Sequence, residues 1–584
     1  MPPFRVVVFS SSDPGDIVRL IRRIHREVPD ARVSGVLYEQ RPGKPLGRRV
    51  RDLAKNFREA DFRRYVVARI RGAVLARLAA VGGAALAFVH AARPPAPPGD
   101  DLTTACAANG CRVLVTQDCH GAEALAFVRG LAPDLGLVYG TRILKRSLFG
   151  IPRLGSINIH KRKVPDYRGG GPVGLWELLD DAPAIGVTVH EVVEALDAGA
   201  IIHAETIPIH QYDTLTSLAL KADVVGNDLL VRAVADYARG TVRPTAQSGE
   251  GRMFRAPKPA QLMRLQQQLT ANRPPFRAVR SRPMSKLLLR TVLGLPVAAV
   301  RNRIRRRRGQ FPVMILFHHM VSDRPHPFAI STEHFLRHVR FLRRYYNVVS
   351  LTDAIAMLRA HRVTVPTVVI TIDDGYRDNF LTLRAIREHV DVPITLFVTT
   401  EHVTKGSEFS HDVANDRHGF APLTWAQVAQ LRREGCEIGS HTRTHFDCAS
   451  NDPVALHDEI VGSKRDLQAE LGEPATAFAF PFGRPANISP EAMRLATETY
   501  GCVLSAYGGS NFAASGVTHL RRWGYRNDLW ETELQLQSLL ELEPRVDVAV
   551  GDPAGRDVSR MRRINGKKSG TSANIVASSQ KSSA

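Results

Sequence analysis

The stretch Val368-Val-Ile-Thr-Ile-Asp-Asp-Gly375 is an apolar run of strand length that ends in two adjacent carboxylates and a glycine. The two acids then lie at the sheet edge where the chain turns, and each can face a different partner. One carboxylate can bind a metal ion while its neighbour accepts a proton.

A second motif, Gly439-Ser-His-Thr-Arg-Thr-His445, also follows a predicted strand. Two histidines four residues apart can reach one metal ion from a single turn of chain. A carboxylate and two imidazoles leave coordination positions open for water and substrate, which suits a catalytic site. Either motif alone is more often a turn or a structural pair. The two together, each at a strand end, favour a metal site.

Predicted strands alternate with helices along both halves of the chain, which indicates two α/β folds. A chain of 584 residues is also too long for one core. Whether the second half closes into a barrel or a distorted barrel cannot be decided from periodicity. The predicted strands are Arg5–Ser10, Val113–Val115, Leu135–Val138, Ser156–Ile159, Gly186–Val189, Val313–Phe317, Asn347–Val349, Val368–Ile372, Ile394–Val398, Glu437–Ser440 and Ala477–Phe480.

The second half resembles the polysaccharide deacetylase (NodB homology) family in three motifs. Thr371-Ile-Asp-Asp-Gly375 resembles the first and His441-Thr-Arg-Thr-His445 the second, and Phe478-Ala-Phe-Pro-Phe-Gly483 is similar to a variant of the third. This resemblance implies a distorted (β/α) barrel that removes N-acetyl or N-formyl groups from an amino sugar or oligosaccharide.

The resemblance also implies a role for each motif residue. Asp373 would be the general base, and the backbone N–H of Phe482, after Pro481, would help to hold the oxyanion. A divalent metal ion, which we expect to be Zn²⁺, would activate a water molecule. Its ligands would be Asp374, His441 and His445.

Two features depart from the family pattern. Many members carry an arginine shortly before the proline of the third motif, where this chain has Phe478-Ala-Phe480. The late Leu-x-His motif that usually supplies the general acid is not evident, and His519 matches it poorly. The general acid is therefore unassigned. A non-catalytic carbohydrate-binding scaffold stays an alternative.

The first half carries Ile157-Asn-Ile-His160, Gly186-Val-Thr-Val-His190 and Leu196-Asp-Ala-Gly199 in that order. An Asn can stabilise an oxyanion, a His can shuttle a proton, and an Asp can orient the imidazole. The set resembles the folate-dependent formyltransferases that act on methionyl-tRNA or amino sugars. This resemblance implies a Rossmann-like domain with a parallel sheet, 10-formyltetrahydrofolate as donor, and three catalytic residues, Asn158, His160 and Asp197.

The loop after His160 departs from that family. Arg162-Lys-Val-Pro165 stands where Ser-Leu-Leu-Pro is usual. The added charge either favours a phosphate-bearing acceptor or belongs to a solvated loop. The C-terminal tRNA-binding domain of the family does not follow, so we do not expect initiator tRNA as substrate.

Charge and segment composition constrain the partners and the compartment. The net charge of +22 includes an arginine cluster at 301–308, which is read as a solvated linker or, with the apolar run from 287, as a peripheral contact with an anionic membrane. No nucleic-acid motif accompanies the cluster, and we expect no nucleic-acid partner. The start of the chain lacks the features of a signal peptide, so we expect a cytoplasmic protein. If the arginine cluster contacts an anionic membrane, we expect the protein to lie at the inner face of that membrane.

The predicted organisation is a formyltransferase domain (1–257), a basic connector (258–310), a deacetylase domain (311–548) and a disordered tail (549–584). The fusion predicts two amide-exchanging activities on an amino sugar, a sugar nucleotide or an oligosaccharide. Deacetylation followed by formylation, and formylation followed by deformylation, both stay open. A narrower alternative keeps only the hydrolase active, on chitin-like oligosaccharides.

Overall fold

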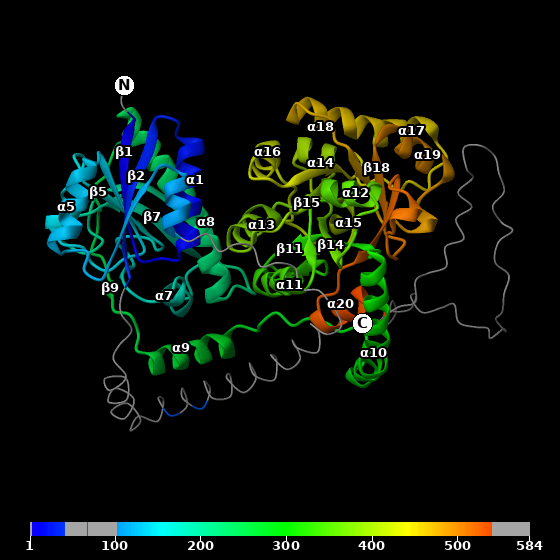
Figure 1. The fold of residues 1–584 in the computed structure, drawn as a ribbon, viewed down its shortest axis with the longest axis horizontal. Coiled ribbons are helices and arrows are strands. Elements are labelled where there is room, and N and C mark those ends of the chain that lie inside the picture. The colour runs from blue at the N-terminus through cyan, green and yellow to red at the C-terminus, as the bar shows by residue number, and fades with distance from the viewer. Residues whose placement is uncertain (1–2, 41–62, 64–66, 68–101, 540–584) are drawn as a thin grey trace, which may run out of the picture. The chain divides into compact units, whose positions relative to one another are not determined.

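The computed structural model describes residues 3–40, 63, 67 and 102–539 (Figure 1). These residues belong to one compact unit that extends to Glu543. The expected disordered tail at 549–584 lies outside the described residues.

The first half of the chain forms a seven-stranded sheet in the order β3-β2-β1-β4-β5-β7-β8. Strands β1 to β5 pair in parallel, and β5, β7 and β8 pair antiparallel. Its elements are β1 (Phe4–Ser10), α1 (Pro14–Glu27), β2 (Ala31–Glu39), α4 (Leu102–Ala108), β3 (Arg112–Thr116), α5 (Ala122–Leu131), β4 (Leu135–Tyr139), α6 (Arg146–Phe149), β5 (Ser156–His160), β6 (Arg168–Gly169), α7 (Leu175–Leu179), β7 (Ala184–Glu191), β8 (Ile201–Pro208), α8 (Leu215–Arg239) and β9 (Met253–Phe254). The predicted Rossmann-like α/β fold is confirmed; the antiparallel edge was not predicted.

Helices cover both faces of this sheet, α1 and α8 one face and α5 the other (Figure 1). Successive strand side chains point to opposite faces, so a central strand needs apolar residues at every position. In β1, Val6 and Val8 pack in the core with α1 and α8, whereas Val7 and Phe9 pack with α5. The continuous apolar sequence of β1 therefore follows from its place in the middle of the sheet.

The second half forms a closed barrel of seven parallel strands in the order β10-β19-β18-β17-β16-β15-β14, closed by pairing of β14 with β10, and β13 adds to β14. Its elements are β10 (Val313–His318), β11 (Met320–Val321), β12 (Ala329–Ile330), α11 (Thr332–Tyr345), β13 (Asn347–Val348), α12 (Leu351–Arg359), β14 (Thr367–Ile372), α13 (Asp378–His389), β15 (Thr395–Val398), α14 (Thr400–Lys405), α15 (Ser410–Val413), α16 (Trp425–Arg433), β16 (Glu437–Ser440), α17 (Pro453–His457), a π-helical turn (Asp458–Gly462), α18 (Ser463–Leu471), β17 (Ala477–Ala479), α19 (Pro490–Thr499), β18 (Cys502–Ser505), β19 (His519–Gly524) and α20 (Leu529–Leu536). The predicted barrel is confirmed.

The barrel explains why the decisive stretch is apolar throughout. All six residues of β14 are buried, since one face lines the barrel interior and the other packs against surrounding helices. The carboxyl ends of parallel strands meet at one rim of a barrel. The residues that follow β14, β16 and β17 are therefore brought together there.

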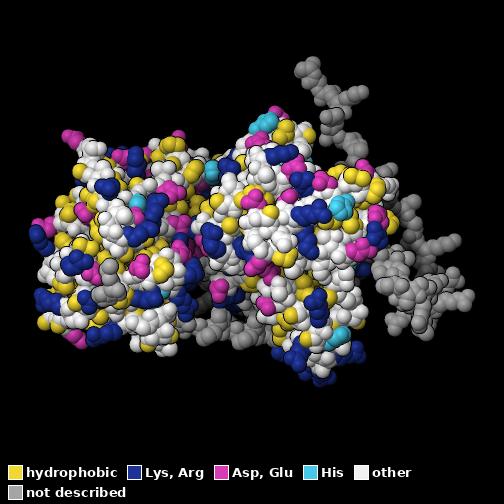
Figure 2. All heavy atoms as spheres, turned by 90° about the horizontal axis from the view of Figure 1, so that it is seen from above, with side chains coloured by type: hydrophobic (Ala, Val, Ile, Leu, Met, Phe, Trp, Pro, Cys, Tyr) yellow, Lys and Arg dark blue, Asp and Glu magenta, His cyan; other side chains and the backbone are white. Residues whose placement is uncertain are grey.

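Two helices fill the predicted connector, α9 (Pro259–Asn272) and α10 (Met284–Arg308). The apolar run from 287 to 300 lies in α10. Among the described residues, no helix combines the length and the hydropathy needed to cross a bilayer. Basic side chains are interspersed with acidic ones over the face in Figure 2.

Candidate active sites

The barrel rim gathers the three predicted metal ligands. Asp374 follows β14, and His441 and His445 follow β16; their ligand atoms all lie within 4.8 Å of one another. The Nε2 atoms of the two histidines are each 3.4 Å from Oδ1 of Asp374. Asp374 is 1% exposed, and neither of its oxygens has a hydrogen-bond partner among the described residues. A buried carboxylate without partners is costly, so this site fits a cation.

The protonation states of the triad also suit a metal ion. His441 places Nδ1 2.7 Å from the carbonyl oxygen of Ala479. A carbonyl only accepts, so Nδ1 carries the proton and Nε2 keeps its lone pair for the site. Burial lowers the pKa of His445 to about 3, although Asp374 opposes this shift. Burial alone would raise the pKa of Asp374, but His319 and the two histidines outweigh it and hold the pKa far below its usual value. Metal sites require neutral imidazoles and an ionised carboxylate.

Asp373, the predicted general base, forms a buried ion pair that the sequence did not predict. The Arg522 guanidinium donates from one Nη to Oδ1 of Asp373 at 2.7 Å and to the hydroxyl of Thr371 at 3.1 Å. Both partners of the ion pair are at most 2% exposed, and the guanidinium lies 4.8 Å from the ring centroid of Phe317 and 5.4 Å from that of Phe397. Arg522 on β19 therefore provides a cation at the acid, although the third motif lacks the arginine that many family members carry.

The third motif lies beside the triad. Phe482 follows β17 and Pro481, is 52% exposed, and places its ring centroid 4.8 Å from that of His445. Asp374, His445 and Phe482 all have positive φ, at 68°, 61° and 57°. Non-glycine residues seldom adopt this conformation, and such residues cluster at functional sites. The oxyanion role of the Phe482 N–H stays a prediction.

Two further histidines that the prediction did not use lie near the triad. His319 follows β10 and acts electrostatically on Asp374, and the ring of His411 lies 5.2 Å from that of His445. Tyr376 donates to Asp412 at 2.7 Å and lies 2.8 Å from Nε2 of His411. The pair His318-His319 at the end of a predicted strand was the available sequence signal for His319. No spacing rule points to His411.

His519 is not brought to this site. It begins β19, three residues before Arg522, and its Nε2 lies 2.8 Å from the hydroxyl of Ser505. The metal triad, in contrast, follows the carboxyl ends of its strands. His519 is therefore excluded as the general acid.

The first sheet gathers the predicted formyltransferase residues at a cavity of about 420 Å³. Asn158 and His160 lie on β5, and Asp197 lies in the loop between β7 and β8. Asp197 is 3.7 Å from Nδ1 of His160 and 3.6 Å from Nε2 of His190. Its Oδ2 accepts a hydrogen bond from the Gly169 N–H at 2.9 Å. The three predicted residues converge, and His190 joins them because β5 and β7 pair Asn158 with His190.

Hydrogen bonds fix the orientation of these groups. Nδ1 of His190 faces the carbonyl of Glu191 at 2.8 Å, so its Nε2 can accept from the amide nitrogen of Asn158 at 3.2 Å. One Asn158 amide hydrogen is thereby used, and the other has no acceptor among the described residues, so it can face a substrate. Burial lowers the pKa of His160 although Asp197 opposes it. Burial would raise the pKa of Asp197, but His190, His160 and the Gly169 N–H lower it.

The loop after His160 corrects one expectation. Arg162 is 3% exposed and donates to the carbonyl of Pro172, and burial lowers its pKa, opposed by Glu177. Glu177 is itself fully buried, and burial raises its pKa. Arg162 is therefore part of the interior, neither a solvated loop residue nor an exposed phosphate ligand. Lys163 is exposed and pairs with Asp166 at 2.9 Å.

Each half of the chain matches a family of known proteins. A family model described as polysaccharide deacetylase matches residues 360–501, and one described as formyl transferase matches residues 103–234. The chain is 33% identical over 144 residues to a methionyl-tRNA formyltransferase of Enterococcus faecalis, covering 24% of this chain and 45% of the relative. A methionyl-tRNA formyltransferase of Listeria monocytogenes is 39% identical over 112 residues, covering 19% of this chain and 35% of the relative. The chain thus spans less than half the length of these curated relatives.

Among solved structures, the Streptococcus pyogenes deacetylase PplD in complex with acetate is 22% identical, with a TM-score of 0.34, covering 39% of this chain and 99% of that one. A sugar N-formyltransferase from Shewanella sp. is 14% identical, with a TM-score of 0.28, covering 43% of this chain and 76% of that one. Residues 103–234 are thus similar to formyl transferases, and residues 360–501 are similar to polysaccharide deacetylases.

Proposed function

We propose that the second half is a metal-dependent hydrolase that removes N-acetyl or N-formyl groups from an amino sugar or oligosaccharide. The supporting observation is the buried Asp374 carboxylate, which has two imidazoles at 3.4 Å and no hydrogen-bond partner for either oxygen among the described residues. A divalent ion, for which Zn²⁺ suits the donor set, would be held by Asp374, His441 and His445. When bound, it supplies Lewis-acid polarisation and acidifies water.

The protein side chains around the ligands support the remaining chemistry. Asp373 accepts the proton of the attacking water, and Arg522 holds the carboxylate in place and stabilises its negative charge. The N–H of Phe482, next to Pro481, donates to the oxyanion that forms as the amide carbonyl is attacked. The products are a free amine and acetate or formate.

We propose an N-formyltransferase activity for the first half, with 10-formyltetrahydrofolate as the donor that supplies the formyl group when bound. Asn158 directs its free amide hydrogen towards the oxyanion. His160 takes the proton of the attacking amine, and Asp197 at 3.7 Å stabilises the resulting imidazolium. The acceptor would be an amino sugar, a sugar nucleotide or an oligosaccharide.

Both activities are assigned within the predicted organisation: formyltransferase 1–257, connector 258–310 and deacetylase 311–548. A reducing, cytoplasmic compartment suits the six cysteine thiols, all in the described part of the chain and none in a disulfide. Two orders are open, deacetylation before formylation or formylation before deformylation.

A product assay tests the function. The purified full chain is incubated with N-acetylated and N-formylated amino sugars, and with amino sugars plus 10-formyltetrahydrofolate, and products are identified by mass spectrometry. Acetate release followed by formylation supports the first order, and formate release supports the second. Hydrolysis without formyl transfer supports the alternative in which only the hydrolase is active. Neither reaction on any substrate favours the carbohydrate-binding scaffold.

Metal analysis tests the site separately from activity. Asp374→Ala removes the proposed carboxylate ligand, and Asp416→Ala is the matched control because the Asp416 side chain is fully exposed. We expect about one zinc per chain in wild type and in the control, and a loss of zinc in Asp374→Ala. Equal zinc content in all three proteins would refute the site.

A further inference from the structure

Helix α10 presents a continuous apolar stripe to the surface. Leu289, Leu293, Val297, Val300 and Ile304 are spaced by four, four, three and four residues and therefore share one face of the helix. Each is between 46% and 64% exposed. From Leu289 to Ile304, at 1.5 Å per residue, the stripe is about 22 Å long. Isolated exposed apolar residues are ordinary, but an aligned set of this length indicates an interaction surface.

The opposite face of α10 is already used. Leu287 packs against Leu534 of α20, and Ala298 and Ala299 pack with Leu295 and Leu539. The side chain of Asn302 donates to Gln537 at 3.0 Å. The helix is thus fixed by its inner face, and the stripe faces outward.

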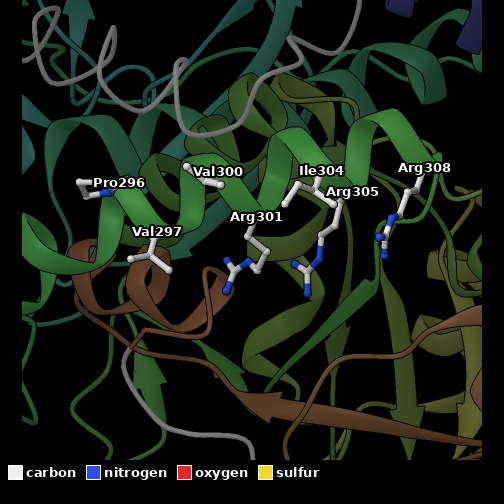
Figure 3. Close-up of a pocket in the computed structure, with 7 residues that line it drawn as sticks. All are labelled: Pro296, Val297, Val300, Arg301, Ile304, Arg305 and Arg308. Carbon is white, nitrogen blue, oxygen red and sulfur yellow. The ribbon is translucent and has the colours of Figure 1, made fainter.

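Cations flank and follow the stripe. The helix contains eight Lys or Arg residues and no Asp or Glu. An open apolar groove of about 650 Å³ runs along Pro296, Val297, Val300 and Ile304 and is bordered by arginines. Figure 3 shows three of these arginines, Arg301, Arg305 and Arg308, extending in the same direction from successive turns.

Some of these arginines contribute to folding contacts as well. Arg301 donates to the carbonyl of Gln537, and Arg305 lies over the ring of Phe512. Four others at the same end of the helix, Arg303, Arg306, Arg307 and Arg308, are exposed. Lys286, near the start of the helix, is exposed as well.

We propose that the α10 stripe, defined by Leu289, Leu293, Val297, Val300 and Ile304, docks on an anionic phospholipid surface. An apolar stripe with basic residues beside it is the pattern of a helix that lies in the interface plane, with its apolar face at the acyl boundary and its cations among anionic headgroups. The absence of any acid from α10 fits a partner of negative charge. A second copy of this chain would bring the same arginines against each other, which disfavours self-association through this face.

Vesicle binding by the full chain tests the proposal. We use vesicles of phosphatidylglycerol with phosphatidylcholine, and of phosphatidylcholine alone, at 0.15 M salt. The stripe variant is Leu289→Ser, Leu293→Ser, Val297→Ser, which keeps the charge unchanged. Its matched control is Leu154→Ser, Val279→Ser, Val454→Ser, at three other exposed apolar positions.

A second pair of variants addresses charge. Arg303→Gln, Arg306→Gln, Arg307→Gln removes three exposed cations from α10. Arg337→Gln, Arg340→Gln, Arg344→Gln on α11 removes three exposed cations elsewhere and is the matched control. Each cation near an anionic membrane contributes about fivefold in binding, so we expect the α10 charge variant to bind about 100-fold more weakly.

We expect the wild-type chain to bind anionic vesicles at least tenfold more tightly than vesicles of phosphatidylcholine alone. The stripe and charge variants should lose this binding, whereas their control variants should keep it. Brominated lipids should quench the tryptophan fluorescence of a Val297→Trp variant. This measurement does not depend on whether the triple variants fold. Unchanged binding of the stripe variant would refute the proposal, since net charge alone then explains adsorption. If the wild-type chain and the control variant are dimers and the stripe variant is a monomer, the stripe instead binds a second copy of this chain. A Val297→Trp fluorescence that is blue-shifted without vesicles, and not quenched with them, would show another segment of the chain on the stripe.

Discussion

Replacing Arg522 with Met tests whether the arginine from the last barrel strand supports the base. Removing one partner of a buried ion pair typically costs about 3–5 kcal/mol, because the other charge stays buried without compensation. Two unit charges about 4 Å apart interact by about 4 kcal/mol at the effective dielectric constant of protein sites. Arg522→Met should therefore lower the free energy of unfolding by about 3–5 kcal/mol, and hydrolysis should become slower because the Asp373 carboxylate is no longer held in place.

The assay is urea unfolding at pH 7, together with the rate of acetate or formate release at the same pH. Arg521→Met on the same strand is the matched control, since the Arg521 side chain is partly exposed, and it should change neither quantity by more than about 0.5 kcal/mol. Adding Asp373→Asn to Arg522→Met should restore part of the stability but not the activity. An unfolding free energy and a hydrolysis rate of Arg522→Met that both equal those of wild type would refute the role of the arginine.

Three further predictions concern other groups. Asp374→Asn keeps the shape of the side chain but removes its charge, and hydrolysis should fall more than 100-fold with loss of zinc, measured by acetate release and elemental analysis. Asn158→Ala removes an oxyanion donor, so formyl transfer should fall about 10²–10³-fold while hydrolysis in the same sample is unchanged; an equal loss of both would contradict separate sites. Burial lowers the pKa of His338 to about 3 in the folded state against 6.5 unfolded, so the unfolded chain binds the extra proton and stability falls as the pH drops below 6.5. Between pH 6.5 and pH 5 this effect lowers the free energy of unfolding by about 2 kcal/mol, and His338→Gln should abolish that decrease, measured by urea unfolding at both pH values.

The architecture was predictable wherever apolar runs end in a turn. Glu437–Ser440 was predicted with the observed bounds, and Val368–Ile372 differs from β14 by one residue. Two strands at the end of the barrel, β18 and β19, were not predicted. The sequence of β19 is His-Leu-Arg-Arg-Trp-Gly, and its two charges hide the apolar pattern of a buried strand.

The same strand explains what was missed in the site. The metal triad and Asp373 were predicted because their residue types follow recognised strands. Arg522 is separated from Asp373 by 149 positions, and only pairing of β19 with β10 brings it there. A buried arginine inside a strand is rare without a partner. Only the closed barrel identifies Asp373 as the partner of Arg522. His190 was in a quoted motif, but its contact with Asn158 depends on the antiparallel register of β5 and β7.

The pairing of β19 with β10 also relates the order of synthesis to catalytic competence. The proposed metal ligands precede residue 446, whereas the cation beside Asp373 is made later, on the strand that closes the barrel. A nascent or truncated chain that ends before His519 would carry every proposed metal ligand but neither a closed barrel nor a supported base. The proposed hydrolysis would therefore require the completion of the last barrel strand.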